Sequence, residues 1–384
     1  MRGNRSSVGV LVSDIHEGED GREQRRTFPE DSFLAALSSR AEELGVDLYV
    51  FTPGSLDPDS GILTGYVRES SGWSEKEVPW PAVIYDRCGP LVSGRIRPYR
   101  DTLSRLAALQ PHVVLNGWLP GKSAQYDALR RSGAELAELV PPSRPLAGRQ
   151  ALCETAESFG SLFLKPDGGM QGRGVISAAP AAEGGWLVRG RDGGSRPFRS
   201  LQPDLDAAAA LICRLAGRTR YVVQPCLPLC DRQGRPFDIR ALVQKDGRGE
   251  WRLTGTAMRR GRPGGVASNL HGGGEAIPAR DGLSMQLGLA AADRVSARID
   301  RLALAAAEAA ESSFGRFAEL GLDFGVEPDG RLWLLEMNSR PGREAFAGFA
   351  GGTARTAVER PLLYARLLCE GPSPTPAGRS LIRN

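Results

Sequence analysis

The sequence contains few lysines, few histidines and no long hydrophobic run. Its apolar N-terminal stretch, residues 8–12, is too short for the core of a signal peptide. No later stretch approaches the length of about 20 apolar residues that a membrane-spanning helix needs. The net charge of +4 comes without blocks of Lys and Arg, so charge does not indicate binding to nucleic acid or to membranes. We therefore expect a cytoplasmic protein.

Patterns for metal binding and disulfides are also missing. The six cysteines include no CxxC pair, and only Cys226 and Cys230 lie close in sequence. The three histidines are far apart and form no HExxH motif: His16, His112 and His271. We therefore discount a zinc site and expect free thiols in a reducing compartment.

Only four of the 49 basic residues are lysines: Lys76, Lys122, Lys165 and Lys245. A lysine that remains in such an arginine-rich chain is more expected where a compact ammonium group is needed. The alternative is chance survival on the surface, which we favour for Lys76 and Lys245. Lys122 and Lys165 are therefore the candidates for binding an anion.

The length of 384 residues, with 41% hydrophobic and 24% charged residues, suits a soluble protein of two or three packed units. The first 118 residues alternate apolar runs with helical stretches, which predicts an open and largely parallel sheet. The expected strands are 8–12, 47–52, 82–85 and 112–115, and the expected helices are 31–44 and 102–109.

The segment after this unit resembles a phosphate-binding P-loop, but it is not one. Gly117 and Gly121 enclose three residues where the motif has four, and Pro120 would stiffen a loop that must curl around phosphates. We reject the P-loop and keep Lys122 as a candidate, followed by a helix over 123–131.

A glycine-rich loop follows the next expected strand, 161–164. Its backbone amides can approach an anion closely, and Lys165 adds a positive charge at its base. The loop glycines are Gly168, Gly169, Gly172 and Gly174. Such a loop can also be a plain hairpin tip; the lysine in a lysine-poor chain favours phosphate.

The middle of the chain offers a connector suited to a nucleobase. After a polar interval over 183–199 and a helix over 204–216, the strand 221–224 ends at two prolines around Cys226. A broken strand has unpaired backbone groups, which an adenine ring can bind.

Two further strands, 237–244 and 250–256, are separated by the turn signal Asp246-Gly247. Asp238 and Arg240 lie two residues apart and therefore share one face of the first of these strands. The loop that follows contains Arg259, Asn269 and His271 and is either functional or a surface excursion. The apolar spacing over 287–310 predicts a helix that packs one face.

The strongest signal is an acidic hairpin near the end of the chain, with strands over 322–326 and 332–337. If Asp329 and Gly330 form a two-residue turn, Val326 faces Trp333 and Asp323 faces Glu336. Asn338 then lies on the same face as Glu336. Because like charges opposed in a sheet destabilise it, the arrangement predicts a site for Mg²⁺ or Mn²⁺ bound together with phosphates.

Two alternatives would remove this metal site. The acids of a solvated hairpin could simply point into water. A three-residue loop of Pro328, Asp329 and Gly330 would shift the pairing by one and place Asp323 and Glu336 on opposite faces.

The order of these features resembles the ATP-grasp superfamily. The stretches FLKPDGGMQGRGV, VVQPCLPL with FDIRALVQ, SNLHGGG and LGLDFGVEPDGRLWLLEMNSRPG are similar to its YheC/YheD branch, described as endospore coat-associated proteins. The resemblance covers about Lys122 to Arg343 and also reaches PAVIYDRCGP, residues 81–90.

The resemblance implies a fold of mixed α/β and α+β class, in which a Rossmann-like pre-ATP-grasp domain precedes a two-subdomain ATP-grasp fold that holds ATP. We assign residues 1–118 to the N-terminal domain, 119–222 to the central or lid subdomain, 223–370 to the C-terminal subdomain and 371–384 to a tail.

The resemblance also implies a role for each candidate residue. The phosphates would contact Lys122 and Lys165, under a lid loop that contains Gly169, Gln171, Gly172 and Gly174. Adenine would contact Gln224, Cys226 and Leu227, and the ribose would contact Asp238. The triphosphate or the reacting acyl group would face Arg240 and Arg259, with Asn269 as a further catalytic candidate, and Mg²⁺ (or Mn²⁺) would be ligated by Asp323, Glu336 and Asn338. Gln224 stands where related enzymes often carry an acid, and Pro225 lacks an N–H, so carbonyls and the Leu227 amide must bind the base.

The implied activity is an ATP-dependent ligase that activates a small-molecule carboxylate as an acyl phosphate for attack by an amine or thiol. Alternatives are a structural or ATP-binding protein of the spore coat, without catalysis, and a phosphotransferase. The resemblance adds the spore and its coat as a second expected location.

Overall fold

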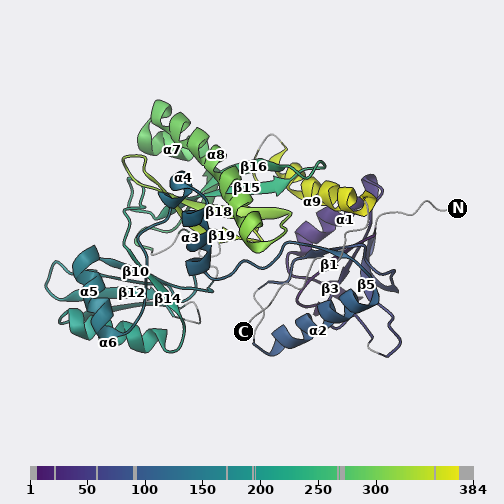
Figure 1. Cartoon of the computed structure of the whole chain (residues 1–384), viewed down its shortest axis with the longest axis horizontal. Helices are drawn as coiled ribbons and strands as arrows, with labels where there is room; N and C mark the ends of the chain where they lie inside the picture. Colours follow the sequence, from purple (N-terminus) through teal and green to yellow (C-terminus); the bar gives the residue numbers. More distant parts are fainter. Residues whose placement is uncertain are drawn as a thin grey trace.

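The structure, a computed structural model, describes residues 7–20, 23–57, 59–89, 93–169, 172–192, 194, 196–265, 268, 273–349 and 352–371. Three sheets organise these residues (Figure 1). The first lies at the right of the view, the second at the lower left, and the third between and above them. The three sheets follow one another in the chain.

The first sheet has the strand order β6-β5-β4-β1-β7-β8. Its strands are β1 (Ser7–Leu11), β4 (Asp47–Phe51), β5 (Thr64–Glu69), β6 (Gly72–Glu77), β7 (Val83–Asp86) and β8 (Val113–Leu115). The neighbours β4, β1, β7 and β8 are parallel, which confirms the prediction for this half. The antiparallel hairpin β5-β6 was not predicted.

Two helices and a small ribbon complete this part of the chain: α1 (Asp31–Glu43), α2 (Ser93–Leu109), β2 (His16–Asp20) and β3 (Glu23–Thr27). The predicted helix 102–109 is therefore too short, since α2 begins at Ser93. Its first turns carry polar residues and a proline, which hide the helical pattern.

The second sheet is antiparallel throughout, with the order β13-β12-β11-β10-β14-β9. Its strands are β9 (Arg144–Pro145), β10 (Leu162–Pro166), β11 (Ile176–Pro180), β12 (Trp186–Arg191), β13 (Pro197–Gln202) and β14 (Tyr221–Pro225). Helices α5 (Arg149–Phe159) and α6 (Leu205–Ala216) pack on it. The polar interval 183–199, for which no element was predicted, contains β12 and the start of β13, because pairing with β11 compensates for its glycine content.

The third sheet has the order β17-β16-β15-β18-β19. Its strands are β15 (Phe237–Lys245), β16 (Trp251–Arg260), β17 (Glu275–Pro278), β18 (Glu319–Val326) and β19 (Leu332–Asn338). Helices α7 (Ala279–Leu287) and α8 (Leu289–Phe314) cover one face, and η2 (Glu344–Phe346) and α9 (Thr353–Glu370) follow the sheet in the chain.

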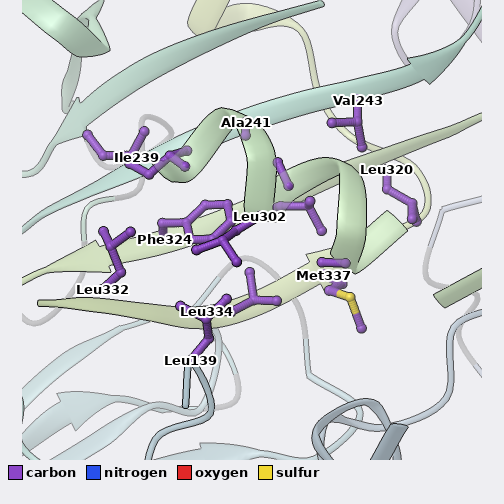
Figure 2. Packing of buried hydrophobic residues seen from close by; sticks show 14 of the residues in the cluster. Leu139, Ile239, Ala241, Val243, Leu302, Leu320, Phe324, Leu332, Leu334 and Met337 are labelled. Atoms are coloured by element: carbon purple, nitrogen blue, oxygen red, sulfur yellow. The ribbon is translucent and has the colours of Figure 1, made fainter. Parts of the chain in front are cut away.

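Helix α8 confirms the predicted amphipathic spacing. Val295, Ile299, Leu302 and Ala306 are buried, and the helix ends before Gly315. Figure 2 shows Leu302 lying among apolar side chains of β15, β18 and β19. Burying such a stripe is the main contribution that holds a helix on a sheet.

Two helical segments pack away from their neighbours in the chain. Helices α3 (Lys122–Arg131) and α4 (Ala134–Ala137) precede the second sheet, but Leu129 and Leu136 join the core of the third sheet. Helix α9 places Leu362 and Tyr364 in the core of the first sheet. The boundaries at 118/119 and 222/223 stay a prediction.

In the part of the chain that the structure describes, none of the helices combines the length and the apolar composition needed to cross a bilayer. No disulfide occurs among the cysteines that the structure describes.

Candidate functional site

The acidic hairpin forms, but not through the predicted turn. The Gly330 N–H donates to the Glu327 carbonyl (2.9 Å), and the Glu327 N–H donates to the Arg331 carbonyl (2.9 Å). Residues 328–330 therefore make a three-residue loop, in which Gly330 has the positive φ of 87° that its last position requires. Val326 pairs with Leu332 instead of Trp333, so the two-residue turn was wrong.

A β-bulge restores the acidic pair that this loop would have separated. Phe324 pairs with Leu334, but Asp323 pairs with Glu336, so Leu335 is an extra residue in the pairing of β18 with β19. One inserted residue cancels the offset of one from the longer loop. The prediction that Asp323 and Glu336 oppose each other is confirmed. Asn338 pairs with Gly321, two residues beyond.

Asp323 is buried between two arginines. Arg240 Nη2 donates to Asp323 Oδ2 (2.9 Å) and Arg240 Nε donates to Oδ1, while Arg259 Nη2 lies 2.9 Å from Oδ2. Burial would raise the pKa of Asp323, but Arg240 and Arg259 lower it to about 2. The group is therefore a carboxylate at any physiological pH, which a metal ligand must be.

Asp238 holds Arg259 from the other side. Arg259 Nε and Nη2 each donate to one Asp238 oxygen at 2.7 Å, a bidentate pair, and Ser268 Oγ donates to Asp238 as well. Burial raises the pKa of Asp238 despite Arg259. Asp238 and Arg240 lie on one face as predicted, but Asp238 is placed to anchor an arginine, and its ribose role stays a prediction.

Lys122 lies between the glycine loop and the acidic pair. Its Nζ donates to the Gly169 carbonyl (2.6 Å) and lies 3.1 Å from Glu336 Oε1. The start of α3 is fixed by Asp167, which accepts hydrogen bonds from the Lys122 and Ser123 N–H groups (2.9 and 2.8 Å). This contact directs Lys122 into the site.

Lys165 reaches the same place from β10. Its Nζ donates to the Tyr126 hydroxyl (2.7 Å) and to the Leu335 carbonyl (2.9 Å). Burial lowers the pKa of Lys165 to about 8, although the charges of Glu336 and Asp323 favour its protonated form. Lys165 uses two of its three N–H donors in these contacts, which leaves one N–H for an anionic ligand.

A cavity lies between the second and third sheets and brings most of the predicted residues together. It is lined by Lys122, Lys165, Gly169, Gly172, Gln224, Cys226, Leu227, Asp238, Arg259, Asp323 and Glu336 among others. Gly174, Arg240 and Asn338 do not line it. Arg240 contacts it through Asp323, and Asn338 follows Glu336 at the end of β19. Gln171, Asn269 and His271 lie outside the described residues.

The connector after β14 offers few donors to a base. Pro225 has no N–H, and the Cys226 N–H donates to the Ser161 carbonyl (3.1 Å). Among the described residues, no backbone hydrogen bond from the Leu227 N–H occurs, and the binding of a base by this amide stays a prediction. The Gln224 amide donates to Ser143 Oγ (2.8 Å) and is therefore held in place.

Sequence reasoning missed several residues of the cavity wall: Phe163, Arg173, Val175, Ser177, Arg189, Leu229, Cys230, Pro236, Phe237 and Ser268. Phe163 precedes Lys165 by two on the same face of β10, so strand alternation could have found it. Arg189 could not be found, because its strand lies in the polar interval 183–199, for which no element was predicted.

The donor set suits a hard divalent cation only in company with a ligand that brings more oxygens. Asp323 and Glu336 are two carboxylates, and no group of three or more His, Cys, Asp and Glu side chains suited to a metal occurs among the described residues. Mg²⁺ is commonly bound through one or two carboxylates plus phosphates. Two lysines beside the acids are placed to meet those phosphates.

Comparison with protein families identifies one model that matches most of the chain. The model of the YheC/D-like ATP-grasp family matches residues 112–368. Two endospore coat-associated proteins of Bacillus subtilis (strain 168) are similar in sequence. YheC is 28% identical over 327 residues, 82% of this chain and 86% of YheC. YheD is 26% identical over 350 residues, 88% of this chain and 74% of YheD.

Solved structures share the fold over nearly the whole chain. The D-cycloserine synthetase DcsG aligns with a TM-score of 0.56 at 16% identity, covering 94% of this chain and 99% of DcsG. The ATP-grasp ligase PsnB, complexed with a phosphomimetic variant of its minimal precursor, Mg and ADP, aligns with a TM-score of 0.52 at 16% identity, covering 95% and 100%. At these identities the likeness establishes the fold of ATP-grasp ligases.

Proposed function

We propose, since the chain belongs to the YheC/D-like ATP-grasp family, that it is an ATP- and Mg²⁺-dependent ligase. It activates a small-molecule carboxylate as an acyl phosphate, which an amine or thiol then attacks with loss of phosphate. The observation that carries this proposal is the cavity in which two lysines and a glycine loop face two opposed carboxylates.

In this proposal, the positively charged residues of the cavity bind the phosphates and the negatively charged residues bind the metal. Lys122 and Lys165 offer ammonium groups to the phosphates, and Gly169 and Gly172 line the cavity beside them. Asp323 and Glu336, with Asn338 at the end of β19, supply the oxygens that would hold Mg²⁺. The metal supplies charge neutralisation between the phosphates during transfer.

The arginines favour transfer to an acyl oxygen. Asp238 and Asp323 orient Arg259 by three contacts at 2.7–2.9 Å, and Asp323 orients Arg240. Arginines held in this way are preorganised donors for the negative charge that develops on a transferring group, and preorganisation of this kind is a large part of catalysis. Gln224, Cys226 and Leu227 would hold the adenine.

Solved ligases of this fold support the class of reaction but do not identify the substrates. The PsnB structure contains Mg and ADP with a phosphomimetic variant of its minimal precursor, and DcsG is a synthetase of D-cycloserine. We therefore include small acids of several chemical classes in the first screen.

A trapping experiment tests the proposal. The protein is incubated with ATP, Mg²⁺, hydroxylamine and a panel of acids, and acyl hydroxamate and ADP are measured. An ADP yield that depends on one acid and equals the hydroxamate supports the ligase. If no acid in a broad panel gives hydroxamate, the ligase assignment is wrong.

A second candidate is an ATP-binding protein of the spore coat without catalysis. The names of the two Bacillus relatives favour it, since both are coat-associated. This candidate predicts calorimetric binding of MgATP with no turnover for any acid. A phosphotransferase would instead give a stable phosphorylated product and no amide.

A further inference from the structure

One face of helix α3 contacts β19 around its bulge. Residues 122, 125 and 126 lie three and four positions apart, so their side chains share this face. The three contacts pair Lys122 with Glu336, Gln125 with the Met337 N–H and Tyr126 with the Leu335 carbonyl. They follow one another along the stretch of β19 in which the register changes.

Tyr126 makes the contact at the bulge itself. Its side chain is 2% exposed, and its hydroxyl donates to the Leu335 carbonyl (2.7 Å). The same hydroxyl accepts a hydrogen bond from Lys165 Nζ (2.7 Å), which also donates to Leu335 (2.9 Å). The ammonium lies 5.4 Å from the centre of the Tyr126 ring. Three groups thus form a closed triangle.

Lys165 uses two of its three N–H donors in this triangle, and a bound phosphate competes with the Leu335 carbonyl for them. If the ammonium turns to the phosphate, it leaves the Leu335 carbonyl, which belongs to a residue without a partner on β18 in the described pairing. A buried carbonyl that loses its donor destabilises its position. The Tyr126 hydroxyl can keep this carbonyl satisfied, whereas a phenylalanine at 126 could not.

We propose that Tyr126 is a positioning residue, whose hydroxyl holds the bulged Leu335 and so keeps Glu336 opposite Asp323 while it also sets the place of Lys165. The inference rests on the proposed function, in which these three side chains bind the metal and the phosphates. Tyr126 does not line the cavity. It acts on the nucleotide only through its neighbours.

The test compares two Tyr→Phe variants by calorimetric titration of the full chain with MgATP. Tyr126→Phe should weaken binding about tenfold, as expected for losing one hydrogen bond to a charged group, and should raise the Mg²⁺ concentration needed for binding. Tyr49→Phe is the matched control, because Tyr49 is also buried and donates to a backbone carbonyl, that of Pro79 (2.6 Å), in the first sheet. It should bind MgATP like the wild type.

A second measurement follows the NMR signal of the Lys165 ammonium group in the absence of nucleotide. The chain has four lysines, so the ammonium groups of protein labelled with ¹⁵N-lysine give few NMR signals, and Lys165→Arg identifies the one from Lys165. Tyr126→Phe should shift this signal, and Tyr49→Phe should leave it in place. A merely structural role of Tyr126 would lower the unfolding temperature of Tyr126→Phe without moving the Lys165 signal.

The outcomes separate the two proposals. Unchanged MgATP affinity together with an unmoved Lys165 signal in Tyr126→Phe overturns the role of Tyr126. Absence of MgATP binding in the wild type overturns the proposed function, whatever the variants do. A shifted signal with weakened binding in Tyr126→Phe alone supports the inference.

Discussion

Two acids of strand β18, Glu319 and Asp323, lie four residues apart and are both held by two arginines, yet their surroundings differ. Glu319 is completely buried and pairs with Arg87 (2.6 Å) and Arg343. Asp323 pairs with its arginines at the edge of the cavity. The first cluster joins the first and third sheets, and the second borders the space between the second and third sheets.

Partners from both the first and the third sheet fill the Glu319 cluster. The Tyr85 hydroxyl and the Gln244 amide also donate to Glu319 (2.6 and 3.0 Å), and Arg87 is held in turn by Glu30. Burial would raise the pKa of Glu319, but Arg343 and Arg87 lower it, so the buried group is a carboxylate. A buried charge persists only when it is paired and hydrogen-bonded in this way.

The apolar cores show the same contrast. Ala318, Leu362 and Tyr364, which follow the second sheet in the chain, join the core of the first sheet. Among the described residues, the core of the second sheet is formed by residues between 146 and 223. We expect the first and third sheets to move together and the second sheet to open and close the cavity. The Glu319 cluster thus joins two sheets, which shows that a buried acid between arginines is not by itself a functional site.

The largest effect is expected for residues of the cavity and concerns ATP-dependent turnover. Glu336→Gln or Lys165→Ala should lower ATP-dependent turnover at least about 100-fold, because each removes a charge placed to act on the phosphates. Far-ultraviolet circular dichroism and the unfolding temperature should show an intact fold. Glu135→Gln, an exposed surface acid, serves as control. Normal turnover in either cavity variant would contradict the site.

The next largest effect is expected at the Glu319 cluster and concerns the stability of the fold. Glu319→Gln should lower the free energy of unfolding by roughly 3–5 kcal/mol, since it leaves two buried arginines without their counter-charge. Urea titration followed by tryptophan fluorescence measures the loss. MgATP affinity of the folded fraction should be retained. Loss of affinity without loss of stability would place Glu319 in the site and break the contrast.

A pH titration sharpens the comparison through Lys165. Because its pKa is about 8 in the folded chain and about 10.4 when unperturbed, the unfolded chain binds more protons above pH 8. The contribution of Lys165 to stability therefore rises with pH in this window, whereas MgATP affinity falls by up to tenfold per pH unit as the charge is lost. Lys165→Arg should remove the fall in affinity, since arginine stays charged.

The smallest effect is expected on the rate at which cysteine thiols are alkylated. Cys226 and Cys230 are exposed and line the cavity, whereas Cys153 lies on α5 outside it. MgATP at twice its Kd should slow alkylation of Cys226 about threefold, since one third of the molecules stay free. Alkylation of Cys153 should not change. Mass spectrometry of peptides measures both rates, and equal protection of the three thiols would point to a general change in the fold instead.

Local patterns were sufficient for most elements and for much of the site. The apolar periods predicted the parallel strands, the helix α8 and the strands of the acidic hairpin, because one buried face imposes a period of two or 3.6. The pairing of Lys165 with a glycine loop and of Asp323 with Glu336 could be inferred in the same way. Arg189 and the strand that carries it could not, since their pattern is weak and pairing with neighbours stabilises the strand.

The acidic pair itself was predicted correctly for a partly wrong reason. The turn is one residue longer than expected, and the bulge at Leu335 compensates for it. No local signal marks this bulge, which is contacted by Tyr126 from a distant helix. The network around Glu319 was missed for the same reason, since Arg87 and Arg343 are far from it in sequence.

The amino-acid order alone thus determined which residues are candidates for the chemistry, because residue type and spacing are written in it. These candidates are two lysines in a lysine-poor chain, a glycine loop, and acids that face one another across a hairpin. Only the folded chain decided how they meet. Contacts between distant segments set the strand register and the bulge, and they decide that Glu319 is enclosed while Asp323 lines the cavity. Such contacts leave no local pattern in the sequence.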